Sequence, residues 1–284
     1  MMQAFCCYLN VVTTFTTFFK FFLHATKEDY NSCQALLSVN ETDTIITLSL
    51  LKQEMTKIIS VANRKGGVGK TTTTINVATA LAAIGKKVVV VDLDPQGNAT
   101  TSMGIIKKNC LASVYDIISG KKNINEALVE TEIPNFYILP SSSDLAGAEI
   151  ELIDVNEREY VLKNSLAGLK NNFDFVFIDC PPSLNLLTIN ALTASDAVIV
   201  PLQCEFLALE GLTDLLRNIN RIKKKFNPEL DLQGVVLTMY DKRNNLSQMV
   251  EKDVRKYFGN KVYETVIPRN VRVSEAPSHG KPVL

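Results

Sequence analysis

From residue 57 onward, short apolar runs alternate with longer stretches in which apolar residues recur at helical spacing. The run 87–92 (KVVVVD) is almost entirely β-branched, which favours a strand buried on both faces. The runs that predict strands are 57–62, 87–92, 135–139, 173–179, 196–201, 232–239 and 262–267. The stretches that predict helices are 70–84, 111–119, 144–153, 157–171, 185–194, 205–226 and 246–258.

This alternation predicts an α/β fold with a doubly wound, mostly parallel sheet and helices on both faces. Residues 55–284 contain no internal repeat and no long linker, so we expect one domain there. In such sheets, ligands bind beyond the carboxyl ends of the strands. The chemistry should therefore lie just after residues 62, 92, 179, 201 and 239.

The first 54 residues differ from the rest in composition. They hold six of the thirteen Phe and three of the six Cys residues, and they contain no Arg, Gly or Pro. Residues 4–23 are apolar and Thr-rich, but they lack the preceding basic segment and the following small-residue cleavage site of a signal peptide. We expect residues 1–54 to be an upstream translated or disordered leader, with Met55 as the functional start.

Composition excludes several classes of protein. The 284 residues are 46% hydrophobic and 21% charged, which fits a globular protein with a core. Thirty basic residues balance thirty acidic ones, so no net charge drives the chain onto nucleic acid or a membrane. The six Cys residues include no C-x-x-C pair, which argues against a zinc knuckle or a thioredoxin motif.

A glycine-rich segment, KGGVGKTT at 65–72, follows the first predicted strand and opens the first predicted helix. Arg64 stands where the general phosphate-loop pattern has a glycine, but the end that binds phosphate is intact. We expect Lys70 to reach the β- and γ-phosphates, Thr71 to ligate Mg²⁺ and Thr72 to contact the α-phosphate. The expected nucleotide-binding residues of this loop are Lys65, Gly66, Gly67, Val68, Gly69, Lys70, Thr71 and Thr72.

Lys65 is a second cation at the mouth of this loop, five residues before Lys70. One interpretation is a solvated surface lysine. In the other, Lys65 contacts a nucleotide bound to a second subunit, because two facing Mg-nucleotide complexes would repel unless each side donated a cation. The second interpretation links dimerisation to ATP and gives both lysines a part in catalysis.

Three aspartates follow predicted strands near the loop. Asp179 comes after the apolar residues 175–178, an arrangement in which a strand-end carboxylate holds Mg²⁺ through its water shell. Asp92 and Asp94 come at the end of the strand 87–92, where a triphosphate would repel them unless Mg²⁺ or water intervened. Asp92 is expected to support the loop or the metal shell, and the alternative is a turn residue at the strand end. The expected metal-site residues are Thr71, Asp179 and Asp92.

The segment KGGVGKTT resembles the deviant Walker A motif of the ParA/MinD ATPase family, and this resemblance covers essentially all of residues 55–284. Four further segments resemble the ParA/Soj branch, which partitions chromosomes and plasmids: 92–98 (DLDPQGN), 178–183 (IDCPPS), 204–212 (CEFLALEGL) and 266–272 (VIPRNVR). The resemblance implies a slow, Mg²⁺-dependent ATPase in which Asp94 orients the attacking water. It also implies that Pro268, Arg269 and Asn270 frame the adenine.

The same resemblance implies partners and a location. It implies a homodimer in the ATP state that binds double-stranded DNA without sequence preference, through basic residues that include Arg243 and Arg272. It further implies a ParB-type protein that stimulates hydrolysis. We therefore expect a cytoplasmic, nucleoid-associated DNA-partitioning ATPase without stable membrane association.

Three other functions are compatible with the same fold class. A membrane-recruited, MinD-like division-site regulator needs a C-terminal amphipathic helix. The chain ends at Leu284, a few dozen residues earlier than is usual in the family, so we expect a C-terminal truncation at that place. An iron–sulfur reductase needs paired interface cysteines, which this chain does not offer. A scaffold without hydrolysis is disfavoured by the intact phosphate loop and aspartates.

Overall fold

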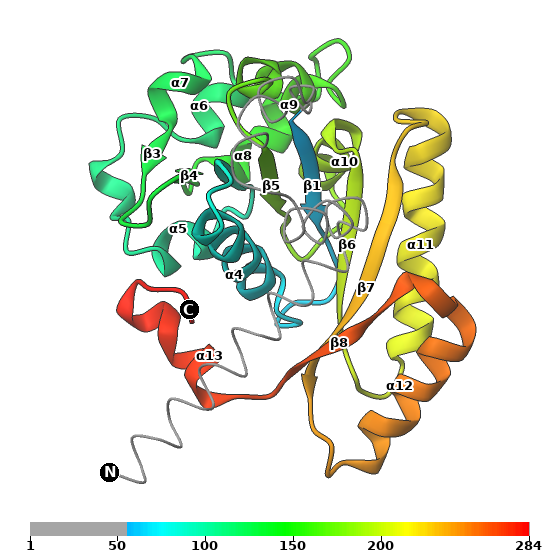
Figure 1. Ribbon diagram of the computed structural model, residues 1–284. Helices are drawn as coiled ribbons and strands as arrows, with labels where there is room; N and C mark the ends of the chain where they lie inside the picture. Colours follow the sequence, from blue (N-terminus) through cyan, green and yellow to red (C-terminus); the bar gives the residue numbers. More distant parts are fainter. Residues whose placement is uncertain (1–55, 284) are drawn as a thin grey trace, which may run out of the picture.

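The computed structural model describes residues 56–283, in which one eight-stranded sheet is covered by helices (Figure 1). The strand order is β3-β4-β2-β5-β1-β6-β7-β8. All neighbouring strands are parallel except β3 and β4, which are antiparallel. The strands are β1 (Lys57–Val61), β2 (Val88–Asp92), β3 (Val129–Glu130), β4 (Phe136–Leu139), β5 (Phe175–Asp179), β6 (Ala197–Gln203), β7 (Asp231–Tyr240) and β8 (Val262–Pro268). The leader expected over residues 1–54, with its junction at Met55, lies outside the described residues.

Alternate residues of the central strands point into two separate cores, one on each face of the sheet. In β2, Val88 and Val90 belong to one core and Val89 and Val91 to the other, and all four are 0% exposed. The same alternation occurs in β1 and β5. A strand buried on both faces has no solvent side, which is why it reads as a continuous apolar run. The predicted parallel sheet covered on both faces is confirmed.

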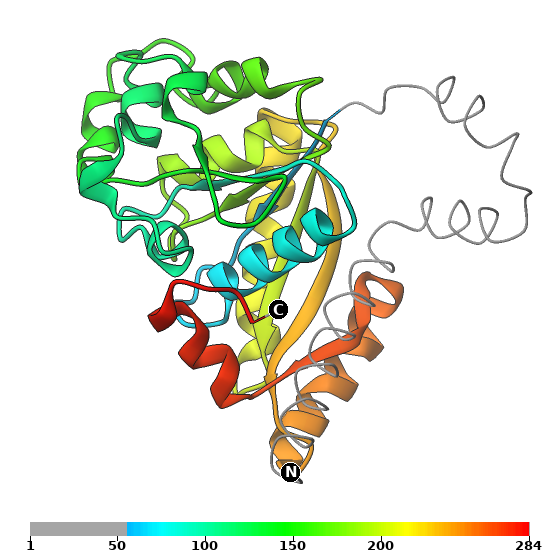
Figure 2. The same ribbon diagram turned by 60° about the vertical axis from the view of Figure 1, so that its left-hand side comes forward.

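Helices cover the two faces unequally. α4 lies on one face of the sheet (Figure 2), where α4 and α5 contribute to one core. α6 to α12 supply apolar side chains to the core on the other face. Among residues 56–283, no helix combines the length and apolar character needed to cross a membrane. The helices are α4 (Lys70–Ala83), α5 (Asn98–Ser102), α6 (Val114–Ile118), α7 (Ile124–Ala127), α8 (Leu145–Glu151), α9 (Val161–Ser165), α10 (Leu186–Ala194), α11 (Ala208–Lys225), α12 (Asn245–Phe258) and α13 (Val271–Glu275).

The long elements match their predicted ranges, whereas the short ones depart from them. α5, α7, α13 and β3 have five residues or fewer, too few to show a hydrophobic period, and the sequence pattern missed them. The helix predicted over 157–171 is wrong in extent. Glu157 has a left-handed φ of 53°, so α9 starts only at Val161 and ends in the 3-10 turn Leu166–Leu169.

The central strands end at one edge of the sheet. Val61 at the end of β1 pairs with Asp179 of β5, and Asp179 pairs with Asp92 of β2. The loop that follows β1 therefore starts beside both carboxylates. Parallel pairing brings together at this edge groups that are more than 100 residues apart in the chain.

Candidate nucleotide-binding site

The loop between β1 and α4 has the backbone of an anion cradle. Gly67 and Gly69 have φ angles of 72° and 86°, a left-handed region in which a residue with a Cβ is strained. Gly69 is the N-cap of α4, and no side chain caps the helix there. The first N–H groups of α4 therefore lack an internal partner and are open to a phosphate.

Lys70 and Thr71 open α4 and face Asp179. The ammonium of Lys70, a residue that is 7% exposed, donates to the backbone oxygen of Lys65 at 3.1 Å. Burial lowers the pKa of Lys70, and the charges of Asp179 and Asp94 oppose that shift because both lie nearby. The Thr71 hydroxyl donates to Asp179 Oδ2 at 2.7 Å. The structure thus brings these predicted residues together around the loop.

Asp92 and Asp179 are neighbours on paired strands, and both are almost completely buried. Burial, followed by the charge of Asp92, raises the pKa of Asp179 to about 8, and burial raises the pKa of Asp92 to about 6. Oδ2 of Asp92 accepts hydrogen bonds from the backbone N–H and the hydroxyl of Thr100, at 2.7 and 2.6 Å. These bonds favour the loop-supporting interpretation of Asp92, whose place in a metal shell stays a prediction.

Asp94 lies in a turn that is held by a residue just after the neighbouring strand β4. Its carboxylate Oδ1 accepts from the N–H of Gln96 at 3.0 Å, and its backbone oxygen accepts from the Ser141 hydroxyl at 2.6 Å. The N–H of Ser141 in turn donates to the Thr100 hydroxyl at 3.1 Å. The backbone of Asp94 is therefore held independently of its side chain, which lies near enough to influence Lys70.

A hollow of about 230 Å³ opens beside the loop, between the start of α4, the end of β7 and the turn after β8. Its lining includes Gly69 and Thr72 together with Pro268, Arg269 and Asn270, the residues expected to frame the adenine. Asn270 also caps α13, since its Oδ1 accepts from the N–H of Arg272 at 2.9 Å. The hollow places apolar side chains together with hydroxyl, amide and guanidinium groups next to the phosphate loop, and the framing of an adenine there stays a prediction.

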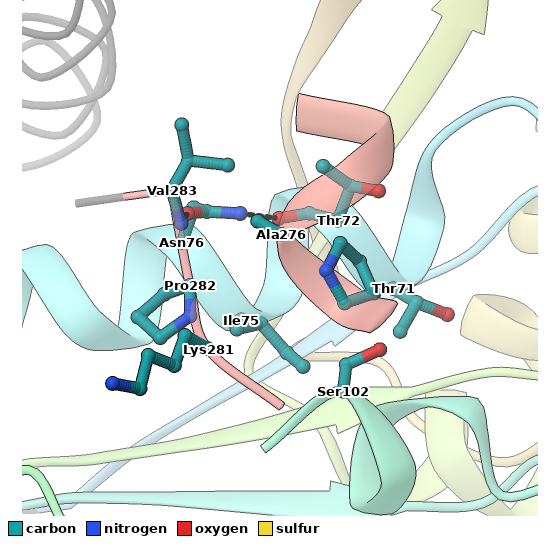
Figure 3. Close-up of a pocket in the computed structure, with 10 residues that line it drawn as sticks. Thr71, Thr72, Ile75, Asn76, Ser102, Ala276, Lys281, Pro282 and Val283 are labelled. Carbon is teal, nitrogen blue, oxygen red and sulfur yellow. Dashed lines mark hydrogen bonds between the residues drawn. The ribbon is translucent and has the colours of Figure 1, made fainter. Parts of the chain in front are cut away.

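The C-terminal segment lies across α4 next to this hollow (Figure 3). The N–H of Val283 donates to Asn76 Oδ1 at 2.9 Å, and Asn76 Nδ2 donates to the Thr72 oxygen at 2.8 Å. Between segment and helix, a small cavity of about 20 Å³ is lined by Thr71 and Thr72 on one side and by Lys281 to Val283 on the other. Asn76 thus links the chain end to the first turn of the phosphate-binding helix.

The donor set fits Mg²⁺ held jointly with a phosphate. Among residues 56–283, no group of three or more His, Cys, Asp or Glu side chains converges on one metal position. Mg²⁺ keeps several waters and is usually held by one or two protein oxygens plus substrate phosphates. The Thr71 hydroxyl and the Asp179 carboxylate, already in contact at the loop, are two such oxygens. They would hold the ion, which would neutralise charge on the phosphates.

The remaining predicted residues lie outside the hollow. Lys65 extends from the loop mouth, and its Nζ forms an ion pair with Glu205 Oε1. Arg243 follows β7 and pairs with Asp241 through two hydrogen bonds, Nε to Oδ1 at 3.1 Å and Nη2 to Oδ2 at 3.0 Å. That pairing lowers the pKa of Asp241 to about 2. Arg272 lies exposed in α13.

Sequence reasoning missed four residues that hold the loops in place. Asn63 Nδ2 donates to the Pro201 oxygen at 2.7 Å while its Oδ1 accepts from the N–H of Lys65 at 3.1 Å, which fixes the start of the phosphate loop. Thr238 donates to the Val68 oxygen at 2.8 Å from β7. The other two are Thr100 and Ser141. Single polar residues of this kind, in a helix, in a strand or just after one, carry no periodic or motif signal, so only their hydrogen bonds identify them.

The raised pKa of Asp179 predicts how stability without nucleotide depends on pH. The folded chain retains the proton that the unfolded chain has already lost, so the contribution of Asp179 to the free energy of unfolding falls between its ordinary pKa of 3.8 and about 8. Asp179→Asn imitates the protonated form and should gain stability relative to the wild type as the pH rises from 5.5 to 8. Urea unfolding in EDTA measures this, with the exposed Asp253→Asn as control. A constant difference across this range would contradict the assignment.

Comparison with known proteins identifies the family of the chain. A family model described as an AAA domain matches residues 56–232. The chromosome partitioning protein ParA of Caulobacter vibrioides is 56% identical over 230 residues, covering 80% of this chain and 86% of that protein. The sporulation initiation inhibitor protein Soj of Bacillus subtilis is 54% identical over 230 residues, covering 81% of this chain and 91% of that protein.

A solved structure of similar fold carries the nucleotide. The Mycobacterium smegmatis protein described as cobyrinic acid a,c-diamide synthase, with bound ATP analog and magnesium, has a TM-score of 0.70 and 44% identity, covering 76% of this chain and 86% of that one. The extent of these matches shows that the chain belongs to the ParA/Soj family of chromosome-partitioning ATPases.

Proposed function

We propose that this ATPase is a DNA-partitioning switch. ATP closes a homodimer, the dimer binds double-stranded DNA without sequence preference, and a ParB-type partner stimulates hydrolysis and release. In this proposal the protein works in the cytoplasm on the nucleoid. The high identity to the partitioning proteins of Caulobacter vibrioides and Bacillus subtilis supports it.

One observation carries the dimer part of the proposal, namely the different placement of the two loop lysines. Lys70 is buried against Asp179 and serves its own phosphate site. The Lys65 side chain is 52% exposed, and its ammonium points to Glu205 outside that site. Lys65 is thus free of its own loop's phosphate position and is presented at the carboxyl edge of the sheet, where a second subunit would meet it.

The charge of the bound substrate explains why such a lysine is useful. Two Mg-nucleotide complexes that face each other carry net negative charge and repel at short distance. A Lys65 ammonium from each subunit would offset that repulsion and would add a positive charge near the γ-phosphate during hydrolysis. ATP, which keeps the γ-phosphate, would then favour the dimer more than ADP does.

The expected DNA residues lie along the same edge of the sheet. β7 and β8 are paired, with Tyr240 opposite Pro268, so Arg243 and Arg272 follow neighbouring strand ends. The bidentate pair with Asp241 holds the Arg243 guanidinium on the surface, where its residue is exposed. Such groups would bind DNA phosphates, and a dimer would double their number. Dimerisation by ATP would therefore raise DNA affinity without any change within one subunit.

Reversing both charges tests this arrangement. Arg243→Glu with Arg272→Glu should weaken binding of the ATP-bound protein to a DNA duplex by at least about tenfold at low salt, because attraction to the phosphates becomes repulsion. The slope of log affinity against log salt should also fall by about one for each phosphate that the variant no longer neutralises. Fluorescence anisotropy with a labelled duplex, with and without ATP and Mg²⁺, measures both quantities.

The matched control reverses two arginines at a distance from this edge. Arg217→Glu with Arg221→Glu makes the same change in net charge on the exposed side of α11 and should leave DNA affinity within about twofold. Undiminished affinity in the Arg243 and Arg272 variant would remove these residues from the interface. ATP-dependent binding to anionic vesicles in place of DNA would support the MinD-like function and overturn the proposed one.

A further inference from the structure

The side chain that meets Lys65 belongs to a loop outside the phosphate site. Glu205 lies between the end of β6 and the start of α11, and its Oε1 forms an ion pair with Lys65 Nζ. The two residues are 140 positions apart in the chain, so the tertiary fold alone creates this pair. The Glu205 side chain is 31% exposed, which leaves the pair accessible at the edge where a second subunit would approach.

The loop that carries Glu205 has two further unusual features. Leu207 adopts a left-handed φ of 66°, although it is not a glycine, and it caps α11 without a side-chain hydrogen bond. Phe206 and Leu207 are 76% and 60% exposed, so two large apolar side chains project from the loop next to the ion pair. Strained backbone and exposed apolar groups are typical of segments that move or become covered on association.

From these contacts we propose that Glu205 is a positioning residue for Lys65, holding its ammonium in the free subunit until a second copy of this chain docks. This inference rests on the proposed ATP-dependent dimer. The second copy would cover Phe206 and Leu207, and Lys65 would exchange the Glu205 carboxylate for the nucleotide phosphates opposite. Because the pair must break in both subunits, Glu205 opposes dimer formation and so weakens the dimer that forms with ATP.

The size of the effect follows from the exposure of the pair. A solvent-exposed ion pair changes an equilibrium by about 1.4- to 5-fold at moderate salt. A symmetric dimer breaks two of them, so their removal should tighten dimerisation by about 2- to 30-fold. The effect should shrink as salt is raised, because screening weakens the pair that the substitution removes.

Sedimentation velocity with a non-hydrolysable ATP analogue and Mg²⁺ tests this on the full chain. Glu205→Gln should lower the dimer dissociation constant by about 2- to 30-fold at 50 mM salt and by less than about twofold at 500 mM. Glu205→Asp keeps the charge and should return toward the wild type. Glu210→Gln removes an exposed carboxylate from the first turn of α11 and should match the wild type at both salt concentrations.

The outcomes separate this inference from the function on which it rests. If the wild type forms dimers with the analogue but Glu205→Gln dimerises equally well, Glu205 does not restrain Lys65. If Glu205→Gln dimerises less well, Glu205 makes a favourable contact across the interface, which also overturns the inference. If the wild type stays monomeric while binding the analogue, the ATP-dependent dimer itself is wrong and the inference fails with it.

Discussion

Lys70→Ala should lower the affinity for ATP by at least about 100-fold, which amounts to loss of binding at ordinary nucleotide concentrations. The Lys70 ammonium is buried beside Asp179, at the start of the helix that faces the phosphates. Its removal would take away charge-assisted hydrogen bonds to two phosphates and leave the carboxylates opposite without a counter-charge. Isothermal titration with ATP and Mg²⁺ measures the change directly.

Loss of binding has to be separated from loss of fold. Thermal unfolding of Lys70→Ala without nucleotide should show one cooperative transition, as in the wild type. Lys252→Ala, an exposed lysine on α12, should bind ATP as the wild type does. Unchanged affinity in Lys70→Ala, in a folded protein, would refute the assignment of this loop to the phosphates.

Asp94→Ala should reduce the rate of ATP hydrolysis by about 100- to 10,000-fold and leave ATP binding in place. The expected role of Asp94 is to orient the attacking water, which matters only in the chemical step. The backbone of its turn is held by Ser141, so the loop should keep its position when the side chain is shortened. ATP would then persist in the site, and the proposed dimer would accumulate.

Phosphate release at saturating ATP gives the rate, and gel filtration in ATP shows whether a dimer accumulates. Asp94→Asn is the informative control, because its amide oxygen still accepts the Gln96 N–H bond while the carboxylate charge is gone. Equal losses of hydrolysis rate in the alanine and asparagine variants would indicate that the carboxylate itself takes part in the chemical step. A loss confined to Asp94→Ala would show that Asp94 only shapes the turn, and wild-type hydrolysis in both would exclude it from the mechanism.

The sheet was predictable because its strands are short, uniformly apolar and separated by amphipathic stretches. Val88 to Val91 illustrate the reason, since a strand between two helical layers has no polar face to break the run. Elements without such a pattern were missed, among them α13, whose five residues include none that is buried. The helix predicted over 157–171 starts only at Val161, because Glu157 has a left-handed backbone conformation that the spacing of apolar residues does not reveal.

The residues of the candidate site also divide into those that the sequence predicts and those that it does not. The phosphate loop is one short segment, which holds its glycines together with Lys70 and Thr71. A turn followed by a helix places these residues together by local geometry alone. Asp179 could be assigned because strand ends of a parallel sheet share an edge. The residues that support Asp94 and the phosphate loop could not be assigned, since Ser141 and Thr238 act through hydrogen bonds from parts of the chain that lie far from these loops in sequence.

The sequence by itself determined the order of strands and helices, the phosphate loop and the family resemblance, because each depends on residues that are neighbours in the chain. Only the tertiary structure decided which groups meet across the sheet. It buried Asp92 beside Asp179, which raises the pKa of both, and it placed Glu205 against Lys65. The physical reason is that burial and charge act between atoms that are close in space. Lys65 and Glu205 are 140 residues apart in the chain, and no local sequence pattern predicts that they meet.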